Sequence, residues 1–422
     1  MSERYDVLIV GASFAGLTLA HHLPKHLRVL VVDAKPSAGA SVESTGLITT
    51  KTYEEFKTFF DIDRFITNPI SAICVVAHNF TDHFVSQTER PWIYQTDTKG
   101  LVAGLARTVP DNVTVQSKTV FIGARREGKE TVATVQTQGE GQRQIACRVL
   151  VGADGSHSKV AQTMPGLDRN TRFLFGYERV YFGDVHLGPE PHETIYHYWF
   201  GEFSLGYGGW LSPTVVDDRP AVRIGLAKLA EDRAEAKDLL KRFTQRLMDD
   251  GALTLEGAID APDYAFGSLI PINGPLKRVA SSGVILIGDA AGYCGAFAAD
   301  GIKGCVVSGK EAAYLVGAYL DGDGTALGRL NERMERHDGL LNYYRRQLRY
   351  RWLWDRMCRN RTFRAMFDII NQERETFVEQ FCDSKDRRRS LAWTVLKWRH
   401  ALRLLKYALF VAFDIVFPKQ VV

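Results

Sequence analysis

RYDVLIVGASFAG occupies residues 4–16, LTLAHHL follows it, and RVLVVD occupies residues 28–33. The apolar run before the glycines predicts a short buried strand, and LTLAHHL predicts a helix. RVLVVD predicts a second strand that ends on a carboxylate, Asp33. A strand, a glycine-rich turn, a helix, a strand and an acid in this order form the fingerprint of a dinucleotide-binding unit.

The residue types of this turn suit a pyrophosphate. Gly11 permits the tight turn and Gly16 lets the helix pack closely on the strand, while Ser13 stands at the middle glycine position. The N-terminus of the helix offers N–H groups and a positive dipole end to a pyrophosphate. Asp33, about twenty residues on, is placed to accept hydrogen bonds from a ribose diol. The stretch therefore predicts the adenosine side of a dinucleotide site.

Length and composition indicate a globular protein of several domains. The chain has 422 residues, of which 45% are hydrophobic and 24% charged, and these values suit two or three domains with full cores. The six cysteines lack metal-ligand spacing, so we expect reduced thiols, no metal site and a cytoplasmic location. No signal peptide precedes the first strand, and no stretch reaches the roughly 18 apolar residues of a membrane span. The net charge is +4, yet residues 333–422 hold 20 Lys and Arg against 10 Asp and Glu.

The middle of the chain alternates between loop and strand patterns. A loop rich in Ser, Gly and Ala at residues 37–46 is long enough to touch a cofactor or a substrate. Period-two alternation over residues 112–151 predicts a three-stranded meander. Residues 172–228 are aromatic and rich in strand-forming types, so they predict a separate antiparallel sheet, and residues 229–250 predict an amphipathic helix. From residue 331 onward the pattern is helical and basic.

Two further motifs accompany GASFAG: VLVGADGSHSKV at residues 149–160 and VILIGDAAG at residues 284–292. Each contains an apolar strand that ends on a carboxylate, which can bind polyol hydroxyls through charge-assisted hydrogen bonds. Together the three motifs resemble the FAD-dependent oxidoreductases of the aromatic-hydroxylase superfamily, and within it the geranylgeranyl reductase family of prenyl-chain reductases. The resemblance covers about residues 4–320. It implies FAD as the cofactor, with NAD(P)H or another electron donor as its reductant.

The resemblance also implies a fold and a division into domains. We expect an α/β protein with a Rossmann-like FAD-binding domain that carries the three-stranded meander, an antiparallel-sheet substrate subdomain and a C-terminal helical region. The expected FAD-binding domain is discontinuous and comprises residues 1–170 and 265–330. The expected substrate subdomain spans residues 171–264, and the basic helical region spans residues 331–422.

The motifs imply where the cofactor contacts lie. Asp154 and Gly155 match the family's position near FAD and the pyridine nucleotide, and Gly288 and Asp289 match the motif that holds the ribityl chain. The full set of expected cofactor contacts is Gly11, Ala12, Ser13, Phe14, Ala15, Gly16, Asp33, Ala34, Ser44, Thr45, Val120, Asp154, Gly155, Gly288, Asp289, Gly301 and Ile302.

The turn after the glycine-aspartate motif departs from the family. Ala296 stands where proline is expected, Ala299 replaces glycine and Asp300 replaces glutamate. Gly301 and Ile302 then open a helix whose N-terminus would face the flavin pyrimidine ring and stabilise the negative charge of the reduced flavin. Because the proline shapes the oxygen-facing side of the flavin in the hydroxylases, its absence favours a reductase.

GYGGWLSP at residues 206–213 resembles the Tyr-x-Trp-x-Phe-Pro stretch of the reductases, with Trp210 and Pro213 in matching positions. Aromatic walls suit a long apolar isoprenoid, and the same side chains can also simply cover a sheet face. A thiol near reduced flavin can protonate a substrate carbanion, although free cysteines are often small buried hydrophobes. The candidate catalytic residues are Tyr207, Trp210, Cys294 and Cys305.

The C-terminal stretch combines basic and apolar residues. Residues 390–417 predict a helix in which Arg399, Arg403 and Lys406 form one basic stripe beside abundant Trp, Leu and Phe. This composition is typical of an interfacial helix, and the polybasic run at residues 385–389 suits anionic lipid. Its central apolar run is too short to span a bilayer and is interrupted by Asp414. The helix therefore either makes a peripheral membrane contact at the inner face or packs on the core or in a homodimer.

These observations favour an FAD-dependent oxidoreductase that reduces isoprenoid double bonds of a prenyl lipid or quinone. One alternative is a class A monooxygenase, or a related flavin halogenase, that acts on an aromatic substrate with NAD(P)H and oxygen. Another is a flavin-binding, membrane-associated protein without turnover of its own. We expect no nucleic-acid partner, because the basic tail is hydrophobic and no nucleic-acid fold motif occurs.

Overall fold

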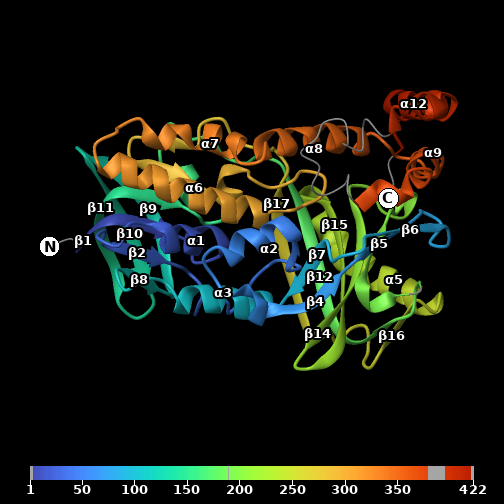
Figure 1. Cartoon of the computed structure of the whole chain (residues 1–422), viewed down its shortest axis with the longest axis horizontal. Helices are drawn as coiled ribbons and strands as arrows, with labels where there is room; N and C mark the ends of the chain where they lie inside the picture. The colour runs from blue at the N-terminus through green and yellow to red at the C-terminus, as the bar shows by residue number, and fades with distance from the viewer. Residues whose placement is uncertain (1–2, 189, 379–394, 420–422) are drawn as a thin grey trace.

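The computed structural model describes residues 3–188, 190–378 and 395–419. It places two large sheets side by side and lays a row of helices across both of them (Figure 1). A small third sheet lies near their junction and consists of β3 (Leu47–Thr49), β7 (Ile93–Thr96) and β4 (Ile66–Ile70). The expected α/β fold, with its antiparallel second sheet and its helical C-terminal region, is confirmed.

The first sheet is built on the dinucleotide-binding fingerprint. Its order is β18 (Ala280–Ser281), β19 (Val284–Leu286), β11 (Gly141–Gly152), β1 (Glu3–Val10), β2 (Val29–Val32) and β8 (Val113–Gln116). β1 pairs parallel with β11 on one side and with β2 on the other. α1 (Phe14–His22) follows β1 and packs against α6 (Ile302–Leu320). β2 is buried along its whole length, which explains its continuous apolar run, since parallel strands are covered on both faces.

The expected meander is present, with one strand reassigned. β9 (Thr119–Glu127), β10 (Glu130–Thr137) and β11 pair antiparallel in succession. VTVQ forms β8 and instead pairs parallel with β2, because its residues meet Val29–Val32 in register. Shorter helices occupy the connections: α2 (Thr50–Lys57), α3 (Thr98–Arg107) and α4 (Lys159–Thr163).

The second sheet is largely antiparallel and has one face towards the first sheet's strand ends. Its order is β16 (Leu253–Leu255), β12 (Phe173–Val185), β15 (Arg219–Leu229), β14 (Gly208–Val216), β13 (Thr194–Tyr198), β5 (Ala72–Val76) and β6 (His83–Gln87), with β17 (Tyr264–Pro271) beside β12. α5 (Ala236–Asp249) covers the other face through Leu239, Leu240 and Phe243. The residues at 171–264 therefore supply most of this sheet, while β5, β6 and most of β17 come from outside that range.

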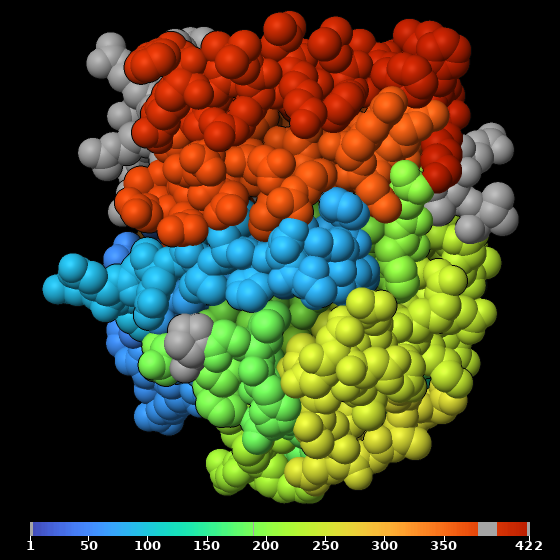
Figure 2. Space-filling view, turned by 90° about the vertical axis from the view of Figure 1, so that its right-hand side faces the viewer, coloured from blue at the N-terminus to red at the C-terminus, as the bar shows by residue number. Residues whose placement is uncertain are grey.

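The C-terminal helices form a layer above both sheets. α7 (Leu330–Arg336) and α8 (Leu340–Trp354) extend along the top of Figure 1, and α9 (Asn360–Asn371) and α12 (Ala401–Val416) lie at its far end. In Figure 2 the C-terminal residues, coloured orange to red, form the upper part of the molecule above the blue, green and yellow residues. Within the described residues, no helix has both the length and the apolar character needed to cross a bilayer.

The described part of the expected tail helix is broken before α12. Residues 390–394 lie outside the described part of the chain. Val395 is helical, Leu396 and Lys397 are not, and a 3-10 turn at Trp398–His400 then leads into α12 (Ala401–Val416). Glu373, a buried carboxylate, accepts hydrogen bonds from Lys397, Arg399 and His400 at this break. These contacts hold the 3-10 turn against Glu373. They also correct the expected basic stripe, because Arg399 pairs with Glu373 and precedes α12.

Asp414 has a structural role in the tail that its sequence position does not reveal. Its side chain is fully buried and accepts hydrogen bonds from the backbone N–H of Cys358 at 3.0 Å and the hydroxyl of Thr362 at 2.8 Å. It also pairs with the guanidinium of Arg359 at 2.8 Å. These donors surround the N-terminus of α9, which has no side-chain cap of its own. Asp414 therefore fixes α12 onto α9.

Candidate active site

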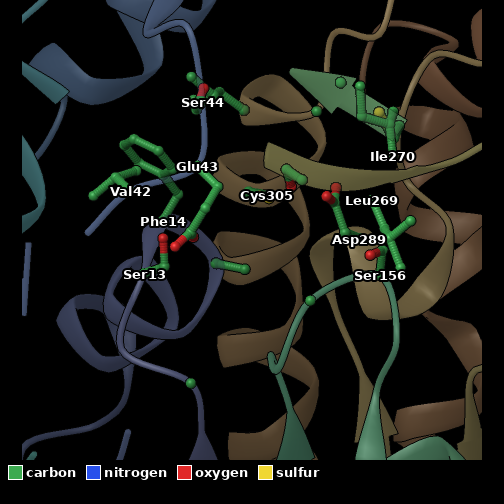
Figure 3. A pocket seen from close by; sticks show the side chains of 18 of the residues that line it. Ser13, Phe14, Val42, Glu43, Ser44, Ser156, Leu269, Ile270, Asp289 and Cys305 are labelled. Atoms are coloured by element: carbon green, nitrogen blue, oxygen red, sulfur yellow. The ribbon is translucent and has the colours of Figure 1, made fainter. Parts of the chain in front are cut away.

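One cavity of about 790 Å³ lies where the carboxyl ends of β1, β2 and β11 face the second sheet. Figure 3 shows its two sides: Ser13 and Phe14 come from the start of α1, while Leu269 and Ile270 come from β17, with Asp289 and Cys305 between them. Every contact residue and catalytic candidate named from the sequence lines this cavity except Ala12, Gly16 and Gly288. The motifs thus converge on the same space.

The glycine-rich turn has the close backbone approach that its sequence predicts. Gly11 has a φ of +110°, and a Cβ at this position would collide with the backbone of Ala153. A Cβ at Gly16 would likewise collide with the carbonyl of Gly11, which explains why Gly16 packs behind the turn and does not line the cavity. The side chain of Ser13, the N-cap of α1, makes no capping hydrogen bond among the described residues. The first N–H groups of α1 are therefore available to an anion.

Asp33 is held in place by two backbone donors. Its carboxylate accepts hydrogen bonds from the N–H of Ala12 at 2.7 Å and of Lys35 at 2.8 Å. An ionised carboxylate can accept about four hydrogen bonds, so it retains acceptor capacity for ribose hydroxyls. Lys35 in turn pairs with Glu43 at 2.9 Å, and both residues line the same end of the cavity.

Asp154 has a different local role from the one its motif suggests. Its carboxylate accepts hydrogen bonds from the hydroxyl of Ser158 and from the N–H groups of Lys159 and Val160, at 2.6 to 3.0 Å. These donors belong to the start of α4, so the side chain is occupied in holding that helix. Asp154 lines the cavity next to Gly155, which has a φ of +79°.

Asp289 is a buried carboxylate in the cavity wall with one oxygen that is unpartnered within the described part of the chain. Its Oδ1 is buried and has no hydrogen-bond partner among the described residues. Burial raises the pKa of Asp289 to about 6, because a charged carboxylate is unfavourable without compensating donors. A ligand that carries hydroxyl groups would supply those donors. The unpartnered oxygen in the cavity therefore fits the polyol chain of FAD.

Two side chains of α8 hydrogen-bond to the turn that leads into α6. Asp300 accepts hydrogen bonds from the hydroxyl of Tyr343 at 2.7 Å and the amide of Gln347 at 3.1 Å, and burial raises its pKa to about 6. The side-chain oxygen of Gln347 also accepts from the backbone N–H groups of Phe297 and Ala298. This support explains how Ala299 keeps a φ of +58° where the family has glycine.

Sequence reasoning missed this support from α8. The pattern does contain one signal, since Gln347 shares a helix face with the buried Leu340, Tyr344 and Arg351. A polar side chain on a buried face needs a partner. The pattern cannot reveal that the partner lies about fifty positions earlier in the chain.

The two candidate cysteines are in the cavity wall. Burial raises the pKa of the Cys294 thiol and of the Cys305 thiol well above the usual value. Both thiols therefore keep their protons at neutral pH. Cys305 lies beside Gly288, whose backbone N–H donates to the hydroxyl of Ser308 at 2.9 Å. Gly288 thus packs behind the cavity wall.

The end of the cavity formed by the second sheet is uncharged. Trp210 and Tyr207 lie there together with His197, Leu269 and Ile270, three residues that the sequence did not single out. Burial lowers the pKa of His197 to about 4, so its ring is neutral at neutral pH. The wall at this end is aromatic and aliphatic.

Comparisons with known proteins agree with this site. Residues 4–324 match the family described as FAD binding domain. Digeranylgeranylglycerophospholipid reductase 1 of Methanothermobacter thermautotrophicus is 26% identical over 339 residues, which cover 77% of this chain and 80% of that protein. A geranylgeranyl bacteriochlorophyll reductase-like protein of Thermoplasma acidophilum has a TM-score of 0.79 at 18% identity and covers 96% of this chain and 99% of its own. The p-nitrophenol 4-monooxygenase of Pseudomonas putida has a TM-score of 0.65 at 16% identity, over 89% of this chain and 95% of its own. The chain therefore belongs to the family of proteins that share this FAD binding domain, and it is an FAD-dependent oxidoreductase.

Proposed function

We propose that this protein reduces carbon–carbon double bonds of a prenyl lipid or quinone. The observation that carries the proposal is the composition of the cavity, which joins the dinucleotide-binding turn to an uncharged wall. The residues between 176 and 270 that line it carry no formal charge at neutral pH. An apolar chain gains affinity from buried area, so such a wall suits an isoprenoid. The similarity to digeranylgeranylglycerophospholipid reductases supports the same substrate class.

The residues of the first sheet and its connections are the proposed FAD contacts. The N-terminus of α1 would bind the pyrophosphate, and Asp33 would accept hydrogen bonds from the adenosine ribose. Asp289 would accept hydrogen bonds from the ribityl hydroxyls, which would satisfy its unpartnered oxygen. α6 begins at Ile302 behind Gly301, which provides no side-chain cap, so its N-terminal N–H groups can face an anionic ring.

The chemistry needs a hydride and a proton. Reduced FAD, held by the contacts above, would supply the hydride for one alkene carbon, with NAD(P)H or another donor as the source of its electrons. The second alkene carbon needs a proton, which a neutral thiol at Cys294 or Cys305 Sγ can hold in the cavity wall, as can water. Trp210 and the aliphatic side chains of β17 would orient the alkene and exclude water from that end. Tyr207 lies on the same wall and is a second candidate proton carrier.

The domain division that we propose follows from the position of this cavity. Residues 1–170 and 265–330 supply the cofactor side, and residues 171–264 supply most of the substrate side. Residues 331–422 contribute α8, which supports the turn at Asp300.

We also propose that the protein makes a peripheral membrane contact through α12 and the turn before it. The side chains of Trp398, Leu402 and Leu409 are 90%, 84% and 62% exposed, whereas Tyr407 and Asp414 of α12 are buried. Arg403 and Lys406 are both exposed on the same helix. A prenyl substrate resides in a bilayer, and an amphipathic helix with cationic side chains binds anionic lipid surfaces. The residues at 385–389 and Trp393 lie outside the described part of the chain.

A monooxygenase is the alternative function. It is favoured by FAD-dependent monooxygenase cdmI of Talaromyces verruculosus, which is 29% identical over 181 residues, 39% of this chain. The deciding experiment is anaerobic photoreduction of the flavin, followed by addition of geranylgeranyl lipids or polyprenyl quinones. Oxidation of the flavin together with a product heavier by two hydrogens supports the reductase. A product heavier by one oxygen, formed only in air, would overturn it.

A further inference from the structure

Glu178 is a buried carboxylate that the proposed chemistry does not use. It lies on β12, its side chain is 0% exposed, and it accepts two hydrogen bonds. The indole N–H of Trp210 donates to Oε2 at 2.7 Å, and the guanidinium of Arg223 donates to Oε1 at 2.8 Å. Trp210 lines the cavity, whereas Glu178 lies behind it. The carboxylate therefore contacts the cavity only through the indole.

The sheet register explains how an indole on β14 reaches an acid on β12. Glu178 is paired with Gly225 on β15, and Gly225 is paired with Trp210 on β14, so the three residues lie abreast on neighbouring strands. A Cβ at position 225 would overlap the indole ring. The missing side chain in the middle strand lets the indole lie across β15. Gly176, two residues before Glu178, lies at the far edge of the ring.

Stability alone does not account for this arrangement. Removing two charges from water is costly, and an apolar pair of similar volume is often equally or more stable than a buried ion pair. The side chain of Arg223 is only 11% exposed, and its Nε has no hydrogen-bond partner among the described residues. The buried Glu178–Arg223 pair therefore costs free energy of folding. What the pair fixes is the orientation of the Trp210 ring in the cavity wall.

We propose that Glu178 is a positioning residue that keeps the indole of Trp210 flat against the sheet and so holds the substrate end of the cavity open for a long chain. This inference rests on the proposed function. If the carboxylate acceptor at position 178 is lost, the indole can rotate away from Gly225 and Gly176 and into the cavity. The space for the distal part of a long prenyl chain then shrinks, while a short chain still fits. Glu178 thus sets chain-length preference through Trp210.

The test uses two double variants that differ only in the acceptor at position 178. E178Q/R223M removes both charges and keeps a carbonyl oxygen for the indole, whereas E178L/R223M removes the charges and the acceptor. Both are compared with the unaltered protein as FAD-loaded holoenzymes. The first readout is the ¹⁵N–¹H resonance of the Trp210 indole, which is assigned by its loss in W210F. The second is KM and kcat for geranyl and geranylgeranyl alcohols.

We expect E178L/R223M to shift the indole resonance and to raise KM for geranylgeranyl alcohol by about five- to tenfold, the equivalent of one hydrogen bond. Its kcat and its KM for geranyl alcohol should stay near those of the unaltered protein. E178Q/R223M should restore the indole resonance and the KM for the long chain. Equal KM values in the two double variants, or an unchanged indole resonance in E178L/R223M, would overturn the inference. If the unaltered protein reduces neither these alcohols nor geranylgeranyl lipids and polyprenyl quinones, the proposed function fails, and the indole resonance still decides whether Glu178 positions the ring.

Discussion

Replacing Asp289 with asparagine should stabilise the FAD-free protein and weaken FAD binding. The physical reason is the same for both effects, because Oδ1 of this buried carboxylate has no partner among the described residues until a ligand provides one. The asparagine side chain would occupy a similar volume without the charge. The substitution therefore removes the cost of burying a charge from the FAD-free protein. It also removes a charge-assisted hydrogen bond from the FAD complex.

The pKa of Asp289 gives the magnitude. Burial raises it from 3.8 to about 6, which corresponds to about 3 kcal/mol of lost stability above that pH. A raised acid pKa means that the folded protein binds more protons than the unfolded chain between about pH 4 and 6. Stability of the FAD-free protein should therefore fall as the pH rises through this range. Asp300 also has a pKa of about 6, so part of the pH dependence of stability should remain in the variant.

The assay is urea unfolding of FAD-free protein at pH 5 and pH 8, with FAD affinity measured by equilibrium dialysis. We expect Asp289→Asn to raise the free energy of unfolding at pH 8 by up to about 3 kcal/mol and to reduce the difference between the two pH values. FAD should bind roughly tenfold to a hundredfold more weakly, as expected for a hydrogen bond to a charged group.

Asp154→Asn is the matched control: burial raises the pKa of this carboxyl as well, but three donors at the start of α4 already hydrogen-bond to it. It should destabilise the FAD-free protein by about 1 kcal/mol, as loss of a helix cap does. The reasoning about Asp289 is refuted if Asp289→Asn destabilises the FAD-free protein at pH 8, or if the pH dependence is the same as in the unaltered protein.

Three further outcomes are expected. Asp33→Ala should weaken FAD binding by roughly 1–3 kcal/mol, because it removes a charged acceptor; stoichiometric FMN in the purified protein would contradict the adenosine-side assignment. The combined substitutions Trp398→Ser, Leu402→Ser and Leu409→Ser should abolish co-sedimentation with anionic vesicles without lowering Tm, since these side chains are exposed; co-sedimentation equal to that of the unaltered protein would exclude α12 as the contact. The imidazole of His337 lies between Glu55 and Glu311, and these carboxylates raise its pKa to about 9. Stability from this contact should be lost as the pH rises from 6.5 to 9, and His337→Gln should remove about 1–2 kcal/mol of that pH dependence after allowance for solvent screening, as measured by urea unfolding at both ends of the range.

The sequence by itself determined the features that depend on neighbouring residues. The strand, glycine turn and helix around Gly11 are such a feature, because a tight turn and a helix N-terminus need particular residue types within a few positions. The meander strands alternate with period two for the same reason, since each strand buries one face. The turn residues that these rules identify, together with the contacts that the family resemblance implies, nearly all line one cavity.

The tertiary structure decided which partner each polar side chain meets. Asp154 accepts hydrogen bonds from the first residues of α4. Asp414 accepts them from residues around the start of α9, fifty-two or more positions earlier in the chain. Gln347 reaches the turn at Asp300 from α8. None of these pairings has a fixed spacing in the sequence, because helix packing and strand order bring the partners together.

The indole of Trp210 shows the same division most clearly. Its aromatic type and its place in GYGGWLSP could be recognised from the sequence. Its orientation depends on the register that sets Gly225 between Trp210 and Glu178. Register arises from the pairing of whole strands, so only the folded sheet determines which acid an indole can reach.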